Sequence, residues 1–124
     1  HSYTGNPLAC SAALATLAIF EQEDVLNQNR LKAEKLTQLL QPVAQHALVR
    51  NFRHMGMIWA FEVHTKQINF SKTFYMAALA AGLLVRPIGN TVYLMPPYVI
   101  SHTEMEFIAN TLLALLHQLP ANGE

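Results

Sequence analysis

The fold of this chain is organised around residues 86–98, RPIGNTVYLMPPY. Within this stretch, Thr91 to Met95 is rich in β-branched and aromatic residues, a composition that predicts a strand. The residues just before it, 82–85 (GLLV), predict a helix stop followed by a short buried strand. Ile88-Gly89-Asn90 predicts a turn, because glycine and asparagine tolerate positive φ angles. We therefore expect two short strands joined by a tight turn.

Arg86 is the candidate binding residue of this stretch. Pro87 fixes its own φ angle and biases the residue before it towards an extended conformation. A guanidinium group at the end of a strand, on a stiffened backbone, has the geometry for bidentate capture of a carboxylate. The alternative is an arginine that forms an ordinary surface salt bridge at a strand end. Spacing alone favours the alternative.

Further strands and helices are predicted on both sides of this stretch. Val49 to Arg53 alternates weakly, and Met57 to Val63 is the strongest strand pattern in the chain. The predicted helices run from Pro7 to about Glu21, from Asp24 to about Leu40 or Val43, from Lys72 to about Ala81, and from Ser101 onward. We expect an α+β domain with a three- or four-stranded, largely antiparallel sheet and helices on one face.

Local signals mark where these helices start and stop. Asn6 is a good N-cap before Pro7, Ser71 is a candidate N-cap for the third helix, and Ser101 with Glu104 has capping-box spacing. The first helix is apolar on nearly all sides, which predicts that it lies buried between layers rather than on a wet surface.

The composition points to a covered surface. The chain has 124 residues, enough for one domain, with 52% hydrophobic and only 13% charged residues. Such a low charge density indicates that another domain or subunit covers much of the surface. The formal net charge is zero, so no electrostatic argument favours binding to nucleic acid or to an anionic membrane.

Cysteine and histidine usage narrows the setting further. Cys10 is the single cysteine, which excludes an intrachain disulfide framework and fits a reducing compartment. No run is apolar enough to span a bilayer and no signal peptide is visible, so we expect a cytoplasmic protein.

The six histidines show no metal-ligand spacing with one another or with Cys10, and we expect no metal site. The chain begins at His1 in a loop-like segment, which suggests a piece of a longer protein.

No residue of the chain is a convincing catalytic group by itself. The four lysines lie on polar faces or in loops, without the apolar setting that would lower a lysine pKa for Schiff-base chemistry: Lys32, Lys35, Lys66 and Lys72. The hydroxyl groups of Ser2 and Thr4 precede a helix start, where they could help to bind an anion. The alternative for both is ordinary loop capping.

Two segments resemble the class III pyridoxal-phosphate aminotransferases. They are residues 2–13, SYTGNPLACSAA, and residues 82–98, which contain RPIG followed by YLMPPY. The second segment narrows the resemblance to a branch of the class that acts in biotin biosynthesis. The resemblance implies that residues 1–124 are the C-terminal small domain of a fold-type I enzyme, with a short piece of the large domain at the N-terminus. The Schiff-base lysine of the family would lie upstream of this chain, so the chain alone is expected to be inactive.

The resemblance also implies roles for three residues. Ser2 stands where the family has a Ser or Thr that contacts the cofactor phosphate of the partner subunit in a homodimer. Arg86 stands where an arginine holds the carboxylate of the oxo-acid substrate, and Tyr93 where a nearby tyrosine lies. With these roles, the resemblance outweighs the salt-bridge interpretation of Arg86.

The implied reaction is a ping-pong transamination. An amino group would pass from a donor, S-adenosylmethionine in most of that branch, by way of pyridoxal 5'-phosphate to 8-amino-7-oxononanoate. Two alternatives remain open at this stage. One is another class III aminotransferase, acting on ornithine, acetylornithine or a 4-aminobutyrate-like amine. The other is a non-enzymatic α+β binding or dimerisation module.

Overall fold

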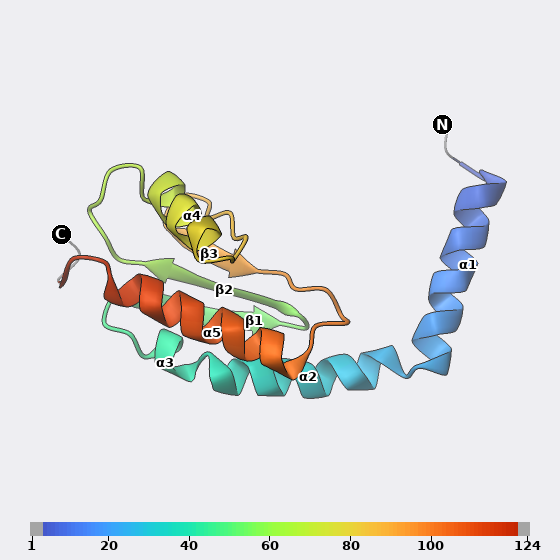
Figure 1. Ribbon diagram of the computed structural model, residues 1–124. Helices are drawn as coiled ribbons and strands as arrows, with labels where there is room; N and C mark the ends of the chain where they lie inside the picture. The colour runs from blue at the N-terminus through green and yellow to red at the C-terminus, as the bar shows by residue number, and fades with distance from the viewer. Residues whose placement is uncertain (1–3, 122–124) are drawn as a thin grey trace.

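The structure, a computed structural model, describes residues 4–121. Its helices and strands follow one another as α1 (Pro7–Gln22), α2 (Val25–Leu39), α3 (Gln41–Ala44), β1 (Val49–Met55), β2 (Ile58–Val63), α4 (Phe70–Ala80), β3 (Thr91–Leu94) and α5 (His102–His117). Figure 1 shows a small sheet with α2, α3, α4 and α5 gathered around it, and α1 standing apart.

The sheet has three antiparallel strands, which agrees with the predicted three or four, and their order is β1-β2-β3. The central strand, β2, alternates strictly, so that Trp59, Phe61 and Val63 point into the core. On β3, Val92 lies opposite Phe61, and Tyr93 lies opposite Ala60 on the other face. The period-2 alternation of β2 and β3 therefore separates a buried face from an open face.

A bulge in β1 keeps two arginines on the open face. Arg50 pairs with Glu62 and Arg53 pairs with Ala60, so three residues of β1 advance against two of β2. Asn51 lies within this bulge and has a φ angle of 54°, a left-handed conformation that asparagine tolerates. Arg53 then forms a salt bridge of 3.1 Å with Glu62.

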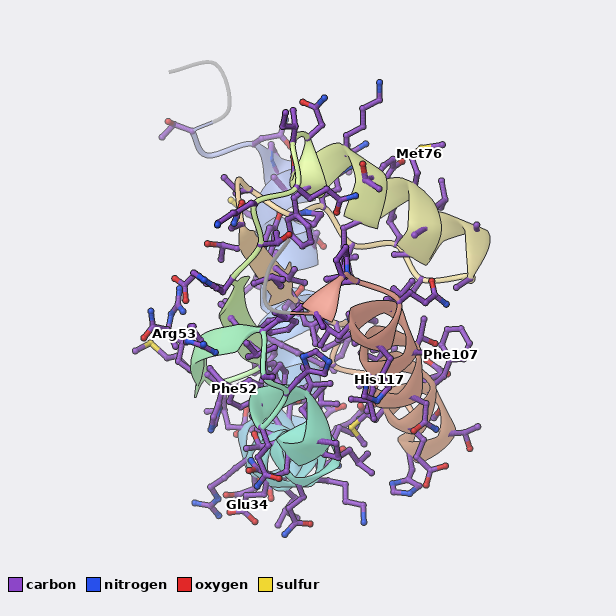
Figure 2. The ribbon with its side chains drawn as sticks, turned by 90° about the vertical axis from the view of Figure 1, so that its left-hand side faces the viewer. Glu34, Phe52, Arg53, Met76, Phe107 and His117 are labelled. Atoms are coloured by element: carbon purple, nitrogen blue, oxygen red, sulfur yellow. The ribbon has the colours of Figure 1, made fainter. Side chains whose placement is uncertain are left out.

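Apart from α1, the helices cover one face of the sheet, which confirms the α+β fold class. Figure 2 shows α4 and α5 on one side of the strands, with Arg53 reaching out on the opposite side. The covered face forms one core with the helices, and the largest side chains fully buried in it are Leu36, Leu40, Val43, Trp59, Phe61, Val63, Val92, Leu112 and Leu116.

Two of the predicted helix caps are confirmed. The Asn6 side chain accepts a hydrogen bond of 3.0 Å from the amide of Ala9, and Ser101 accepts one of 3.1 Å from the amide of Glu104. The predicted start of α4 is wrong, because the helix begins at Phe70 after Asn69, whose φ angle is 61°. Burial explains the earlier start, since Phe70 packs with Phe74 in the core at a ring distance of 5.2 Å.

The predicted burial of α1 is also wrong for this structure. No residue of α1 is buried, and Leu8, Leu14 and Leu17 remain exposed. Its C-terminal end has an aromatic contact, where the ring of Phe20 meets the ring of Tyr98 edge-on at a centroid distance of 6.0 Å. Within residues 4–121, no layer covers the apolar sides of α1. Within the same range, no helix is both long enough and apolar enough to cross a membrane.

A pair of histidines joins the end of α3 to the end of α5. The rings of His46 and His117 lie 5.2 Å apart, and His46 Nδ1 accepts a hydrogen bond of 3.1 Å from the amide of Leu48. Burial, and next the neighbouring His117, hold the pKa of His46 below its ordinary value of 6.5. The folded chain therefore takes up a proton on His46 less readily than the unfolded chain does.

This shift predicts that acid destabilises the fold through His46. Between the ordinary pKa and the lowered one, the unfolded state binds more protons, so the free energy of unfolding falls as the pH drops below about 6.5. His46→Asn removes the titration and retains an acceptor for the Leu48 amide, so it should flatten this slope. Urea denaturation at pH 7.5 and pH 5.5 measures how the free energy of unfolding changes with pH. His64→Asn is the control, because His64 is exposed. An unchanged slope in His46→Asn would contradict the assignment.

Candidate functional site

The segment that carries Arg86 leaves α4 through a tight helix stop at Gly82. Gly82 has a φ angle of 87°, its amide donates to the carbonyl of Leu79 at 3.0 Å, and the amide of Leu83 donates to the carbonyl of Ala78 at 2.8 Å. This pair of bonds is the Schellman arrangement, which ties the chain after a helix to the last helical turn. The start of the Arg86 segment is thereby fixed to α4.

Alternating burial then turns Arg86 outward. Leu83 and Val85 are buried, whereas Leu84 and Arg86 are exposed. The predicted strand at 82–85 is wrong: the segment is extended and alternates as a strand would, but it pairs with no neighbouring strand. Of the two strands predicted for the hairpin, β3 forms and the strand at 82–85 does not. An isolated bridge between Ile88 and Thr91 joins the start of β3 to the residues that follow Arg86.

The predicted turn between the segment and β3 is present. The amides of Ile88 and Thr91 each donate to the other's carbonyl at 2.9 Å, and Gly89 has a φ angle of 58°. Asn90 fastens the turn to the end of β2, since its side-chain amide donates to the carbonyl of Val63 at 3.0 Å. The turn thus folds β3 back alongside the Arg86 segment.

The result is a groove of about 460 Å³ that brings Arg86 and Tyr93 together. Its charged lining residues are Arg86 and Glu104, and its other walls are largely apolar: Leu83, Leu84, Val85, Leu94, Met95, Pro96, Pro97, Ile100, Phe107 and Ile108. Among residues 4–121, no carboxylate lies within ion-pair distance of Arg86. The alternative of an ordinary surface salt bridge therefore finds no partner in this part of the chain.

Arg86 also borders a second, smaller hollow of about 290 Å³, which the sequence did not predict. Ser71, Lys72 and Tyr75 of α4 line it together with Arg86 and Pro87. The Arg86 Cζ atom lies over the ring of Tyr75, 5.8 Å from its centroid. The i, i+4 spacing of Ser71 and Tyr75 shows that they share a helix face, but only the Gly82 turn brings that face to Arg86.

Two further expectations concern the cofactor phosphate and the Schiff-base lysine. Ser2 is outside the described residues, so its contact with a cofactor phosphate stays a prediction. Within residues 4–121 no lysine is buried, and Lys32 is engaged with the carbonyl of Tyr98. Every lysine of the described residues is therefore at least partly exposed.

Comparison with known proteins assigns the family. The sequence pattern described as Aminotransferase class-III matches residues 1–116. The chain belongs to the class III aminotransferase family. The class III aminotransferase match covers both segments that carry the resemblance, residues 2–13 and 82–98, together with nearly all of the chain between its ends.

Individual class III relatives and structures agree with this assignment. The chain is 43% identical, over 96% of its length, to the adenosylmethionine-8-amino-7-oxononanoate aminotransferase of Helicobacter pylori. The crystal structure of the protein of that name from Methanocaldococcus jannaschii superimposes with a TM-score of 0.85 at 30% identity, covering 95% of this chain and 29% of that one. The (R)-1-hydroxy-2-aminoethylphosphonate ammonia-lyase of Vibrio splendidus is 31% identical over 86% of this chain and 24% of its own.

The class III chain described here is shorter than these relatives. It spans 28% of the Helicobacter pylori protein, so the comparisons extend to only that share of the relative. The similarity to a lyase also shows that relatives of this chain carry out more than one kind of reaction. Family membership therefore leaves the choice of reaction to the chemistry of the site.

Proposed function

We propose that this chain is the C-terminal small domain, with a short N-terminal piece of the large domain, of a pyridoxal-phosphate-dependent aminotransferase. The whole enzyme aminates 8-amino-7-oxononanoate to 7,8-diaminononanoate in biotin biosynthesis, with S-adenosylmethionine as the donor. The observation that carries the proposal is the groove in which Arg86 and Tyr93 meet apolar walls. A long aliphatic acid needs one cation for its carboxylate and an apolar surface for its chain.

The groove residues bind and orient the substrate. Arg86 donates two parallel hydrogen bonds to the carboxylate, and Tyr93 limits how the aliphatic chain leaves it. Exposed apolar side chains such as Leu84 and Met95 cover the methylene groups and exclude water from them. Fixing the carboxylate end in this way sets where the ketone at the other end reacts. When bound, pyridoxal 5'-phosphate supplies the electron sink for amino transfer.

The substrate test uses the full-length enzyme. Purified enzyme is offered the amino acceptors 8-amino-7-oxononanoate, 2-oxoglutarate and succinate semialdehyde in parallel, and amine products are measured by mass spectrometry. We expect 8-amino-7-oxononanoate to be the preferred acceptor, because the groove offers an apolar run beside its single arginine. Preference for either of the other two acceptors would assign the chain to an ornithine-, acetylornithine- or 4-aminobutyrate-type enzyme instead. Residues 1–124 alone serve as the negative control and should give no product.

Ser2 is the proposed contact to the cofactor phosphate across a homodimer. Ser2→Ala in the full-length enzyme should weaken cofactor retention by about 1.5–3 kcal/mol, the usual worth of a hydrogen bond to a charged group. Titration of the apoenzyme with pyridoxal 5'-phosphate measures the loss, and Thr103→Ala, which removes an exposed hydroxyl group on α5, is the control. If Ser2→Ala leaves the affinity for pyridoxal 5'-phosphate unchanged, Ser2 has only a loop-capping role.

The partners proposed for the enzyme are a second subunit and small-molecule substrates. Support for the homodimer comes from α1, whose exposed leucines require a cover that residues 4–121 do not provide. The zero net charge argues against nucleic acid and anionic membranes as partners. Cys10 is a free thiol, which suits a cytoplasmic enzyme in a reducing compartment.

A further inference from the structure

Tyr75 and Arg86 belong to one rigid unit of the fold. Tyr75 is a half-buried residue of α4, one turn before the helix ends. The two Schellman hydrogen bonds at Gly82 tie the segment that carries Arg86 to that same last turn. Pro87 removes the freedom of the backbone that follows. The backbone positions of the two residues are therefore fixed, and the Arg86 Cζ atom lies 5.8 Å from the Tyr75 ring centroid.

The contact with Tyr75 holds the guanidinium group without occupying its hydrogen bonds. In a cation–π contact the cation lies over the face of an aromatic ring, within about 6 Å of its centroid. The N–H donors of a guanidinium group lie in its plane, so a stacked arginine keeps them free for a carboxylate. An acidic neighbour would fix the same side chain but would compete with the substrate for those donors.

The surroundings of Arg86 favour an anion as the missing partner. The hollow beside Tyr75 is lined by Ser71, Lys72, Tyr75, Arg86 and Pro87, which include two cations and no acidic residue. Within residues 4–121, neither cation has a carboxylate within ion-pair distance. Among residues 4–121, the guanidinium group thus has an aromatic support on one side and no carboxylate within ion-pair distance, that of Glu104 in the groove included.

We propose that Tyr75 is a positioning residue for Arg86, and that its ring presents the in-plane N–H donors of the guanidinium group to the substrate carboxylate. This inference rests on the proposed function, in which Arg86 binds the carboxylate of 8-amino-7-oxononanoate. Tyr75 makes no contact with the substrate in this arrangement. It acts by restricting the guanidinium group to the orientation that binds.

The test compares Tyr75→Leu with Tyr75→Phe in the full-length holoenzyme. Cation–π contacts at exposed sites correspond to about a two- to fivefold change in an equilibrium constant. Tyr75→Leu should weaken apparent binding of 8-amino-7-oxononanoate by about that factor in single-turnover kinetics, with the limiting rate and the donor half-reaction unchanged. Tyr75→Phe keeps the ring and should behave as the wild type. Met76→Ala is the control, because Met76 is exposed on the outer side of α4 (Figure 2).

A double-mutant cycle separates positioning from general structural support. In the Arg86→Ala background, Tyr75→Leu should have no further effect, since the group that it positions is gone. An equal loss in both backgrounds, or a loss in the donor half-reaction as well, would overturn the inference. If Arg86→Ala weakens the oxo-acid half-reaction but Tyr75→Leu does not, only the role of Tyr75 falls. If Arg86→Ala has no effect on that half-reaction, the proposed function of Arg86 falls and the inference falls with it.

Discussion

Arg86→Ala in the full-length enzyme should cost about 2–5 kcal/mol in the 8-amino-7-oxononanoate half-reaction, as expected when one partner of a desolvated charge pair is removed. The physical reason is that no other cation lines the groove, so the substrate carboxylate would be left without a partner. Single-turnover kinetics of the oxo-acid half-reaction and of the donor half-reaction measure the two effects separately. The donor half-reaction should change less.

Arg86→Lys separates the contribution of the paired N–H donors of the guanidinium group from the contribution of its positive charge. A lysine retains the positive charge but loses the two parallel donors and the planar guanidinium group, whose Cζ atom lies over the Tyr75 ring. We therefore expect Arg86→Lys to recover only part of the loss. Arg30→Ala is the matched control, because Arg30 is an exposed arginine on α2 whose side chain bonds to Asn27. Equal and small effects of Arg86→Ala on both half-reactions would make Arg86 a structural residue.

Periodicity and turn chemistry account for most of what the sequence predicts of the fold. The alternation of residues 57–63, the turn at Gly89 and the cap at Ser101 each act over a few residues, and each appears in the structure close to where it was expected. Local signals of this kind depend on backbone preference and on which face is apolar, and both are written in neighbouring residues.

The errors occur where distant parts of the chain decide the outcome. Residues 82–85 have the apolar run of a strand, but the hydrogen bonds at Gly82 tie the start of this segment to the end of α4, and the chain meets β3 at the isolated bridge between Ile88 and Thr91. The helix α1 has the composition of a buried helix, but no element within residues 4–121 covers it. A window of sequence cannot show which partner is available.

Some residues of the candidate site could be found from local sequence signals, and one could not. Arg86 and Tyr93 could be chosen from the sequence because Pro87 stiffens the backbone and because the segment resembles a known family. Tyr75 could not, since its contact with Arg86 depends on the direction in which the chain leaves α4. That direction is set by the hydrogen bonds at Gly82, which the sequence marks only as a helix stop.

Phe61→Ala should lower the free energy of unfolding of the chain by about 3–5 kcal/mol, the usual range for truncating a buried phenylalanine. Phe61 is fully buried at the centre of the middle strand, opposite Val92, and its ring stacks on Phe52 at 6.5 Å. The helices packed over the sheet cannot close the space that the missing ring leaves. Urea denaturation followed by the fluorescence of Trp59, the single tryptophan, measures the change in residues 1–124.

Ile58→Ala is the matched control for this prediction. Ile58 lies on the same strand with 47% of its side chain exposed, so its truncation should cost less than about 1 kcal/mol. Phe61→Leu fills much of the space and should fall between the two variants. Equal losses for Phe61→Ala and Ile58→Ala would mean that both faces of β2 are equally covered. The helix-covered face would then not be the core that holds β3 in place beside the Arg86 segment.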